Sequence, residues 1–92
     1  MHNFRTSKLL DKILIKLSKK DKKLPDQILK KIEGVANSFD IEHYKNLKYD
    51  LKDYKRVHIG HFVLAFKFDK KENIIYFVDF DHHDNIYKKK YL

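Results

Sequence analysis

The fold is decided by residues 54–66, which read YKRVHIGHFVLAF. Apolar and polar residues alternate before Gly60 and again after it, and a period of two is typical of a half-buried β-strand. Gly60 and the histidine after it predict a two-residue hairpin turn, because glycine accepts a positive φ. We therefore expect two antiparallel strands here, with Val57 buried and with Arg56 and His58 on the opposite face.

A third predicted strand, residues 74–80, follows a polar turn and consists largely of β-branched and aromatic residues. Strand alternation predicts that Val78 and Phe80 point to the core. The same alternation predicts that Asp79 and Asp81 point away from it.

The chain after this strand carries His83 and Tyr87, which are four residues apart. If the chain becomes helical near His82, these two side chains meet on one face. If the strand continues instead, a period of two places His83 on the side of Asp79. The sequence leaves both arrangements open.

Upstream, residues 7–39 carry two apolar stripes with a helical period. The first stripe consists of Leu10, Ile13, Leu14 and Leu17. The second consists of Ile28, Leu29, Ile32, Val35, Ala36 and Phe39. Thr6 or Ser7 can cap the first helix, and Pro25 suits the first turn of the second, where a missing N–H costs nothing. Residues 40–53 have weak periodicity and predict a loop with a short helical turn.

These patterns predict an α+β fold: an N-terminal helix hairpin packed on a small twisted antiparallel sheet, with Phe4 in an edge strand. Residues 1–92 are enough for a single domain with one thin core. The chain has no cysteine, so neither a disulfide nor a thiolate metal site supports it. No signal-peptide core and no membrane-length apolar run are present, and we expect a cytoplasmic protein without a membrane partner.

The formal net charge of +8 and the pI near 9.6 favour a polyanionic partner. RNA, DNA, an acidic protein and a membrane surface are all partners with the negative charge that this requires. With only Gly34 and Gly60 in the chain, a phosphate-binding P-loop, a dinucleotide fingerprint and a nucleophile elbow are excluded.

Histidine can take and give a proton near neutral pH, so His58 and His83 on neighbouring elements suit phosphodiester cleavage by general acid–base catalysis. One group would remove the proton of a ribose 2′-OH, and another would protonate the departing 5′ oxygen. A cation would stabilise the transition state. The candidate cations, which would also bind RNA, are Arg56, Lys48, Lys52 and Lys55.

Metal binding is the alternative chemistry for this region, because imidazole and carboxylate are ligands for zinc and other divalent ions. The candidate ligands are His58, His61, His82, His83, Asp79, Asp81 and Asp84. Their spacing disfavours a metal site, since the chain has neither a His-x-x-x-His nor a Glu-x-x-His pattern, and we expect no metal or other cofactor.

The order of elements and three motifs resemble the RelE/ParE superfamily of toxins from toxin–antitoxin systems. The motifs are YKRVHIG (residues 54–60), FVLAF (residues 62–66) and HDNIY (residues 83–87). Within the superfamily the chain is most similar to the YafQ-type and RelE-type mRNA interferases. These carry a Cys-His-Ile strand, matched here by Val57-His58-Ile59, and a terminal histidine and aromatic, matched by His83 and Tyr87.

The resemblance implies ribosome-dependent cleavage of mRNA without a metal, which leaves a 2′,3′-cyclic phosphate and a 5′-hydroxyl. It also implies a hetero-oligomer with a cognate antitoxin of the RelB or DinJ type. By the same resemblance His83 is a general acid, His58 orients the scissile phosphate and Tyr87 is the closing aromatic. The general base falls on Lys45, with His43 close by.

Two positions depart from the family pattern. His61 replaces an acidic residue in the hairpin turn, and Val63 stands where many RelE-type relatives have an arginine that clamps phosphate. Arg56 or lysines would have to replace that clamp. Two alternative functions follow from the resemblance: a ParE-like toxin that binds DNA gyrase, and a degenerate toxin without catalysis.

Overall fold

The computed structural model describes residues 2–48 and 51–88. The helices and strands follow one another in a β-α-α-β-β-β-α order. Their bounds are β1 Asn3–Thr6, α1 Lys8–Ser18, α2 Lys23–Ala36, the 3₁₀ helix η1 Ile41–His43, β2 Lys55–Ile59, β3 Phe62–Asp69, β4 Ile74–His82 and α3 His83–Ile86.

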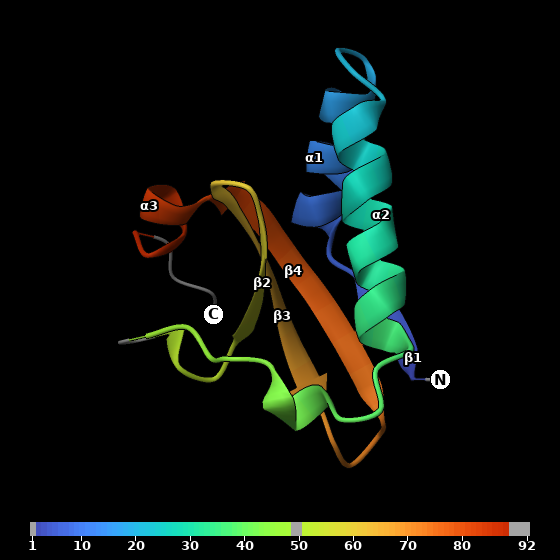
Figure 1. Cartoon of the computed structure of the whole chain (residues 1–92), viewed down its shortest axis with the longest axis vertical. Coiled ribbons are helices and arrows are strands. Elements are labelled where there is room, and N and C mark those ends of the chain that lie inside the picture. The colour runs from blue at the N-terminus through green and yellow to red at the C-terminus, as the bar shows by residue number, and fades with distance from the viewer. Residues whose placement is uncertain (1, 49–50, 89–92) are drawn as a thin grey trace.

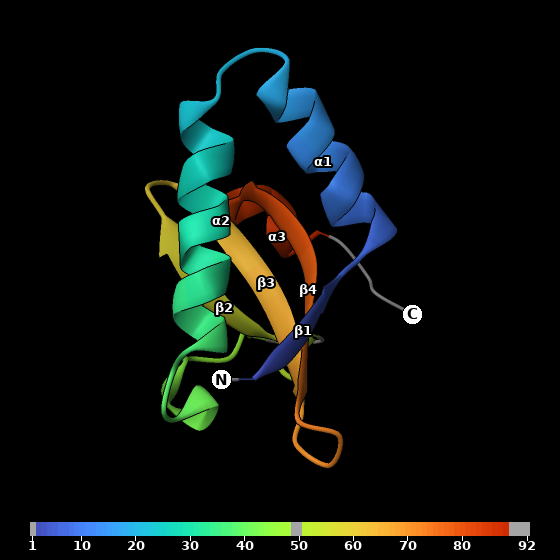
Figure 2. The same cartoon turned by 90° about the vertical axis from the view of Figure 1, so that its right-hand side faces the viewer.

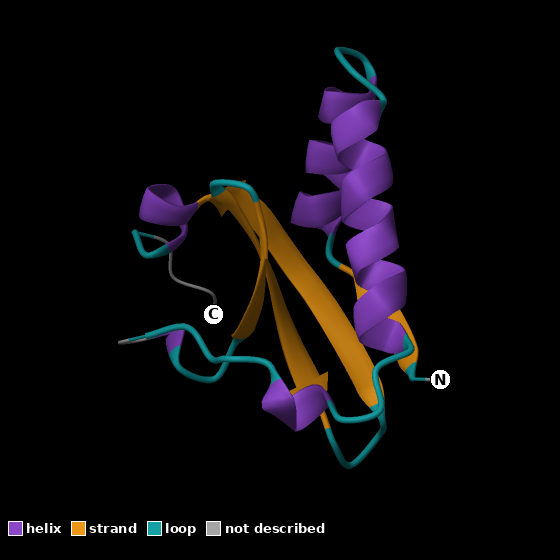
Figure 3. Ribbon diagram, viewed as in Figure 1, coloured by secondary structure: helices purple, strands orange, loops and turns teal. Residues whose placement is uncertain are grey.

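The two long helices, α1 and α2, lie side by side against one face of the sheet, and α3 lies on the other side (Figures 1 and 2). The strand order is β1-β4-β3-β2, with β2, β3 and β4 forming an antiparallel meander. β1 is the edge strand expected around Phe4, and it runs parallel to β4, so the sheet is mixed. The predicted α+β class, a helix hairpin on a small sheet, is confirmed (Figure 3).

Local signals in the sequence place the N-terminal ends of both helices. Ser7 is the N-cap of α1, where its Oγ accepts a hydrogen bond from the Leu10 N–H at 3.0 Å and donates one to the Val78 carbonyl at 2.6 Å. Pro25 lies in the first turn of α2, as expected. Phe39 was predicted to extend the apolar stripe of α2, but the helix ends at Ala36 and the Phe39 side chain is fully exposed.

The main core fills the space between the helix pair and the sheet. It contains apolar side chains from both layers, which agrees with the predicted stripes and with the predicted inner face of β3. Its buried members are Leu10, Ile28, Ile32, Val35, Ile41, Ile59, Leu64, Phe66, Ile75, Phe77 and Phe80. Leu29 is an exception, since it is 51% exposed on the outer side of α2.

A second, smaller apolar cluster lies on the opposite face of the sheet, the face on which alternation placed Arg56 and His58. Its buried members are Leu47, Leu51, Val63, Ala65 and Ile86. The loop before β2 and the short helix α3 supply the residues that cover this face (Figure 1). The protein therefore has one large apolar layer and one small one, with the sheet between them.

A β-bulge in β4 changes which of its residues face each layer. Phe66 pairs with Phe77 and Ala65 pairs with Asp79, so Val78 is an extra residue between the two pairs. The expected core position of Phe80 is confirmed, but Val78 packs on the second cluster instead of the main core. Asp79 points away from the main core as expected, yet it is completely buried.

Residues 40–53 form the expected loop with a short helical turn, η1; Tyr49 and Asp50 in this segment lie outside the described residues. Gly60, with a φ of 61°, makes the predicted hairpin turn between β2 and β3. None of the described helices has the length and apolar character needed to span a membrane.

Candidate functional site

Four of the predicted site residues meet beside the second cluster. The rings of His58, on β2, and His83, at the start of α3, are stacked with centroids 6.0 Å apart. The His83 ring contacts the Tyr87 ring edge-on at 5.4 Å. Arg56 Nη1 donates a hydrogen bond to the Tyr87 hydroxyl at 3.2 Å. The chain thus turns helical at His83, which is the first of the two arrangements that the sequence left open.

The short helix α3 holds His83 and Tyr87 in place through three local contacts. His82 is its N-cap, with Nδ1 accepting a hydrogen bond from the Asp84 N–H at 3.3 Å. The His83 N–H donates to the carbonyl of His61, in the hairpin turn, at 3.0 Å. Ile86, on the inner side of this helix, is completely buried in the second cluster. Apolar burial at Ile86 therefore fixes the polar residues on either side of it.

The electrostatic surroundings distinguish the two histidines. Partial burial lowers the pKa of His58 below 6.5, and the charges of Arg56 and His83 lower it further. His58 is therefore mainly neutral at pH 7. The carboxylate of Asp84 lies 3.6 Å from His83 Nδ1, where it can balance the charge of a protonated His83 ring.

Val63 occupies the strand position where many RelE-type relatives carry an arginine. Its side chain is completely buried in the second cluster, and it pairs across the sheet with His58. A phosphate clamp at this position is therefore absent, and Arg56, two residues before His58 on the same face of β2, is the cation next to the histidine pair.

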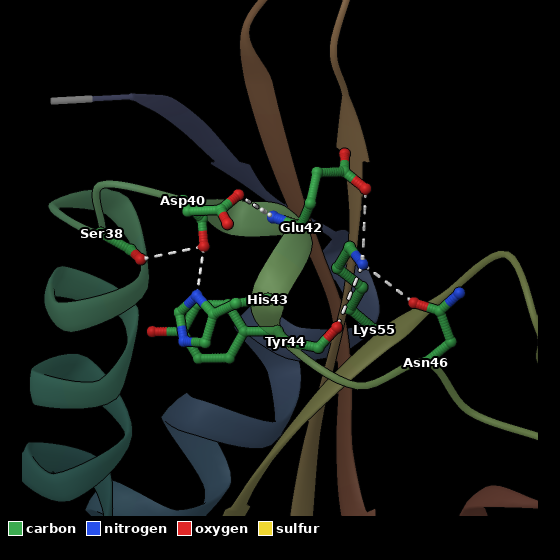
Figure 4. A network of polar contacts seen from close by, with 7 residues as sticks. All are labelled: Ser38, Asp40, Glu42, His43, Tyr44, Asn46 and Lys55. Carbon is green, nitrogen blue, oxygen red and sulfur yellow. Dashed lines mark hydrogen bonds and ion pairs between the residues drawn. The ribbon is translucent and has the colours of Figure 1, made fainter.

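A hollow of about 370 Å³ lies on one side of His58, and its lining includes His43, Lys45 and Arg56. The two residues considered for the general base are therefore brought next to His58. His43 is held in place by its ring contact with Tyr44, with centroids 4.1 Å apart, and by a hydrogen bond between Nδ1 and the Asp40 carbonyl oxygen (Figure 4).

The predicted RNA-binding lysines occupy different environments. Lys48 and Lys52 are exposed, as expected. Lys55 is buried, with its Nζ donating to the Tyr44 carbonyl at 3.1 Å and to Asn46 Oδ1 at 2.9 Å (Figure 4). This position differs from the surface position expected for an RNA-binding lysine, because the ammonium group holds the loop before β2 against the sheet.

A second hollow, of about 360 Å³, lies on the other side of His58 and is lined by the hairpin turn and the start of α3. His61 contributes to it, with its ring stacked on that of His82 at 6.3 Å. His61 is thus close to the histidine pair but belongs to a separate pair of rings. The sequence made His61 a candidate catalytic residue and considered His82 only as a metal ligand, and it did not reveal that their rings form a pair.

In the ranges 2–48 and 51–88, no group of three or more histidine, aspartate or glutamate side chains is arranged to hold a metal ion. The ligand set considered from the sequence is divided by the fold. Asp79 is buried, where its Oδ1 accepts a hydrogen bond from the Phe80 N–H at 2.8 Å. The Oδ1 of Asp81 accepts bonds from the His82 N–H at 2.7 Å and from Asn85 Nδ2 at 3.3 Å.

Comparison with known protein families supports the resemblance stated above. Residues 5–87 match the family described as the ParE toxin of the type II toxin–antitoxin system. A protein of Methanocaldococcus jannaschii named "Putative toxin RelE4" is 54% identical over 93 residues, covering 100% of this chain and 97% of that protein. An uncharacterized protein of Methanosarcina mazei is 43% identical over 79 residues, covering 85% of this chain and 90% of its own.

Solved structures show the same fold. A metal-bound toxin from Helicobacter pylori superimposes with a TM-score of 0.65 at 28% identity, covering 94% of this chain and 99% of that one. A chain of the toxin–antitoxin complex RelBE2 from Mycobacterium tuberculosis superimposes with a TM-score of 0.61 at 19% identity, covering 89% of this chain and 98% of that one.

The chain belongs to the ParE toxin family, within the RelE/ParE superfamily. It is a toxin of a type II toxin–antitoxin system, and its partner in such a system is an antitoxin.

Proposed function

We propose that this toxin is an endoribonuclease that cleaves mRNA on the ribosome in the cytoplasm, with side chains as the acid and the base. The observation that carries the proposal is the pairing of His58 and His83, whose rings are stacked 6.0 Å apart beside Arg56 and Tyr87. Two groups that act on the two ends of one phosphodiester must both lie within hydrogen-bond reach of it, and this pair meets that condition.

The two histidines suit opposite roles in the reaction. A neutral imidazole can accept a proton, so the lowered pKa of His58 suits the group that removes the proton from the 2′-OH. His83, with the Asp84 carboxylate 3.6 Å away, suits the protonated group that gives its proton to the departing 5′ oxygen. The 2′ oxygen attacks phosphorus, the bond to the 5′ oxygen breaks, and the products are a 2′,3′-cyclic phosphate and a 5′-hydroxyl.

Arg56 and Tyr87 support the charged part of the reaction. The guanidinium of Arg56 carries the positive charge that a phosphorane-like transition state needs, and its hydrogen bond to Tyr87 fixes one end of the planar group. His43 and Lys45, in the hollow beside His58, are the alternative bases. Replacing His58, His43 and Lys45 one at a time by alanine identifies the general base. Only the loss of the base should lower the cleavage rate about 10²–10⁴-fold.

Primer extension on a reporter mRNA in a translating extract tests the proposal. The wild-type toxin should create new 5′ ends within codons, where reverse transcription stops, and His83→Ala should remove them. Thermal unfolding of both proteins, followed by circular dichroism, shows whether the variant still folds. An intact message in the presence of folded wild-type toxin would overturn the proposal.

The name of the matched family favours a second candidate function, inhibition of DNA gyrase by surface binding. A supercoiling assay with purified gyrase distinguishes the two functions. Under the nuclease proposal the toxin leaves supercoiling unchanged. Under the gyrase proposal both the wild type and His83→Ala inhibit it.

A further inference from the structure

A groove separates α2 from the free edge of β2, on the side of His58 away from α3. Its volume is about 630 Å³, within the range of about 300–1,000 Å³ typical of ligand-binding clefts. Helix α2 forms one wall with four exposed residues, and β2 with Tyr44 forms the other. Of the residues that line this groove, only His58 takes part in the proposed cleavage reaction.

The α2 wall is a polar, cationic stripe. Gln27, Lys30, Lys31 and Gly34 are spaced by three, one and three residues, so they share one face of the helix, next to the apolar face that enters the core. The lysines offer two ammonium groups and the glutamine an amide to whatever lies in the groove. Such a wall fits a chain of phosphates better than an apolar ligand.

The surface of α2 is open at Gly34, which has no side chain and has no neighbouring atom in front of it. Glycine in the interior of a helix is less stable than alanine, so its presence there calls for a reason. Its φ is not in the left-handed region, and a Cβ added at Gly34 would meet no atom within 4 Å. Neither backbone conformation nor packing inside the protein requires glycine here. The space in front of Gly34 is open, so a ligand in the groove can come close to the helix at this point.

The groove is continuous with the candidate site. His58 lines this groove and also both of the hollows described above. Tyr44 and Val57 line the groove and the hollow that contains Lys45 and Arg56, so the two depressions share a wall. An RNA strand whose scissile phosphate lies at His58 can therefore continue along α2 without leaving the surface.

We propose that the groove between α2 and β2 binds the ribose–phosphate backbone of single-stranded RNA next to the cleaved bond, with Lys30 and Lys31 contacting phosphates. The inference rests on the proposed function for the identity of the strand. It adds Gln27, Lys30, Lys31 and Gly34, all of them on α2, to the residues that recognise RNA.

The test is fluorescence anisotropy with a labelled single-stranded RNA of 2′-O-methyl nucleotides, which has no 2′-OH and cannot be cleaved. It uses the His83→Ala protein, so the result does not depend on catalysis. Lys30→Gln with Lys31→Gln removes the groove lysines. Lys19→Gln with Lys20→Gln is the matched control, because it removes the same charge from two exposed lysines after α1.

The groove variant should bind the RNA about tenfold more weakly and should reduce the slope of log affinity against log salt by about 0.7 for each lost phosphate contact. The control variant should change both quantities much less. Gly34→Leu should weaken binding by filling the groove, whereas Gly34→Ala should not. Equal losses in the groove and control variants would overturn the proposal, because the lysines would then act only through net charge.

A competition experiment separates RNA from an acidic protein segment. Unlabelled RNA should displace the labelled RNA, and poly-glutamate of equal charge should do so much more weakly. Stronger displacement by poly-glutamate would overturn the RNA assignment in favour of an acidic protein partner. RNA binding that depends on Lys30 and Lys31, together with uncut mRNA in the extract, would support the groove and reject only the nuclease activity.

Discussion

The two faces of the sheet differ in how much apolar surface they bury and in which side chains they expose. The helix face buries a continuous apolar layer from six elements, including Phe66 and Phe77, which are completely buried. The opposite face has a much smaller cluster around Val63 and Ile86, and beside it stand His58 and His83. Stability therefore comes mainly from one face, while the other keeps polar groups at the surface.

Phe77→Ala should have the largest effect on folding, because it removes a completely buried aromatic ring from the helix face. We expect a loss of about 3–5 kcal/mol in the free energy of unfolding. Tyr76→Ala, one residue earlier and 38% exposed on the other face, should cost about 1 kcal/mol or less. Urea denaturation measures both. Similar losses at the two positions would contradict the claim that stability comes mainly from the helix face.

Lys55→Met tests what holds the loop before β2, at the edge of the helix face. The Lys55 ammonium bonds the Tyr44 carbonyl and Asn46 Oδ1, so its removal leaves acceptors without that donor. We expect a loss of about 1–3 kcal/mol in the free energy of unfolding. Lys52→Met, at an exposed lysine three residues earlier, should stay within about 0.5 kcal/mol of the wild type. If Lys52→Met proves the more destabilising change, Lys55 does not hold the loop.

Tyr87→Phe should lower the cleavage rate about 3–10-fold, because the Arg56 guanidinium loses a hydrogen bond worth about 0.5–1.5 kcal/mol. Arg56→Gln and the double variant complete a double-mutant cycle for the rate of mRNA cleavage. The two changes should be less than additive. Full additivity would show that the 3.2 Å contact does not position Arg56 for the reaction.

The pKa of His58, lowered by partial burial and by Arg56 and His83, gives the smallest expected effect. NMR titration of the histidine rings should find His58 below 6.5, and Arg56→Gln should raise its pKa towards that value. Arg5→Gln is the matched control, since it removes the chain's other arginine, on β1. A His58 pKa that Arg56→Gln leaves unchanged would contradict the assigned cause.

The same lowered pKa predicts how His58 affects stability. The folded state binds a proton at His58 less readily than the unfolded state, whose histidine pKa is near 6.5. The unfolded state therefore takes up more protons between the lowered pKa and 6.5. The contribution of His58 to stability is complete above this window and is lost as the pH falls through it.

Much of the helix face was predictable, because local periodicity reports burial directly. The apolar stripe from Leu10 to Leu17 and the alternation around Phe66 each needed only a few neighbouring residues. The prediction for Phe39 was wrong because α2 ends at Ala36 and Asn37 is its C-cap, so the apolar period that continues to Phe39 no longer reports a helix. The prediction for Val78 was wrong for another reason. One extra residue in β4 reverses the alternation of its side chains, and only the pairing with β3 reveals that residue.

The candidate site was only partly predictable. Alternation placed Arg56 and His58 on one face, and a spacing of four residues placed His83 and Tyr87 together in a helical turn; the structure brings the four together. The burial of Lys55 depends on a loop carbonyl eleven residues earlier in the chain, so no local pattern reveals it. A possible signal for the α2 groove was present in Gly34, a glycine inside a helical pattern, which on its own has several explanations.

Analysis of the RNA ends after digestion tests the central claim most directly. If His58 and His83 act as base and acid on the 2′-OH and the 5′ oxygen, the upstream fragment will end in a 2′,3′-cyclic phosphate and the downstream fragment will begin with a 5′-hydroxyl. Neither end should form with His83→Ala. Fragments with a 3′-hydroxyl and a 5′-phosphate, or unchanged cleavage by folded His83→Ala, would contradict the account.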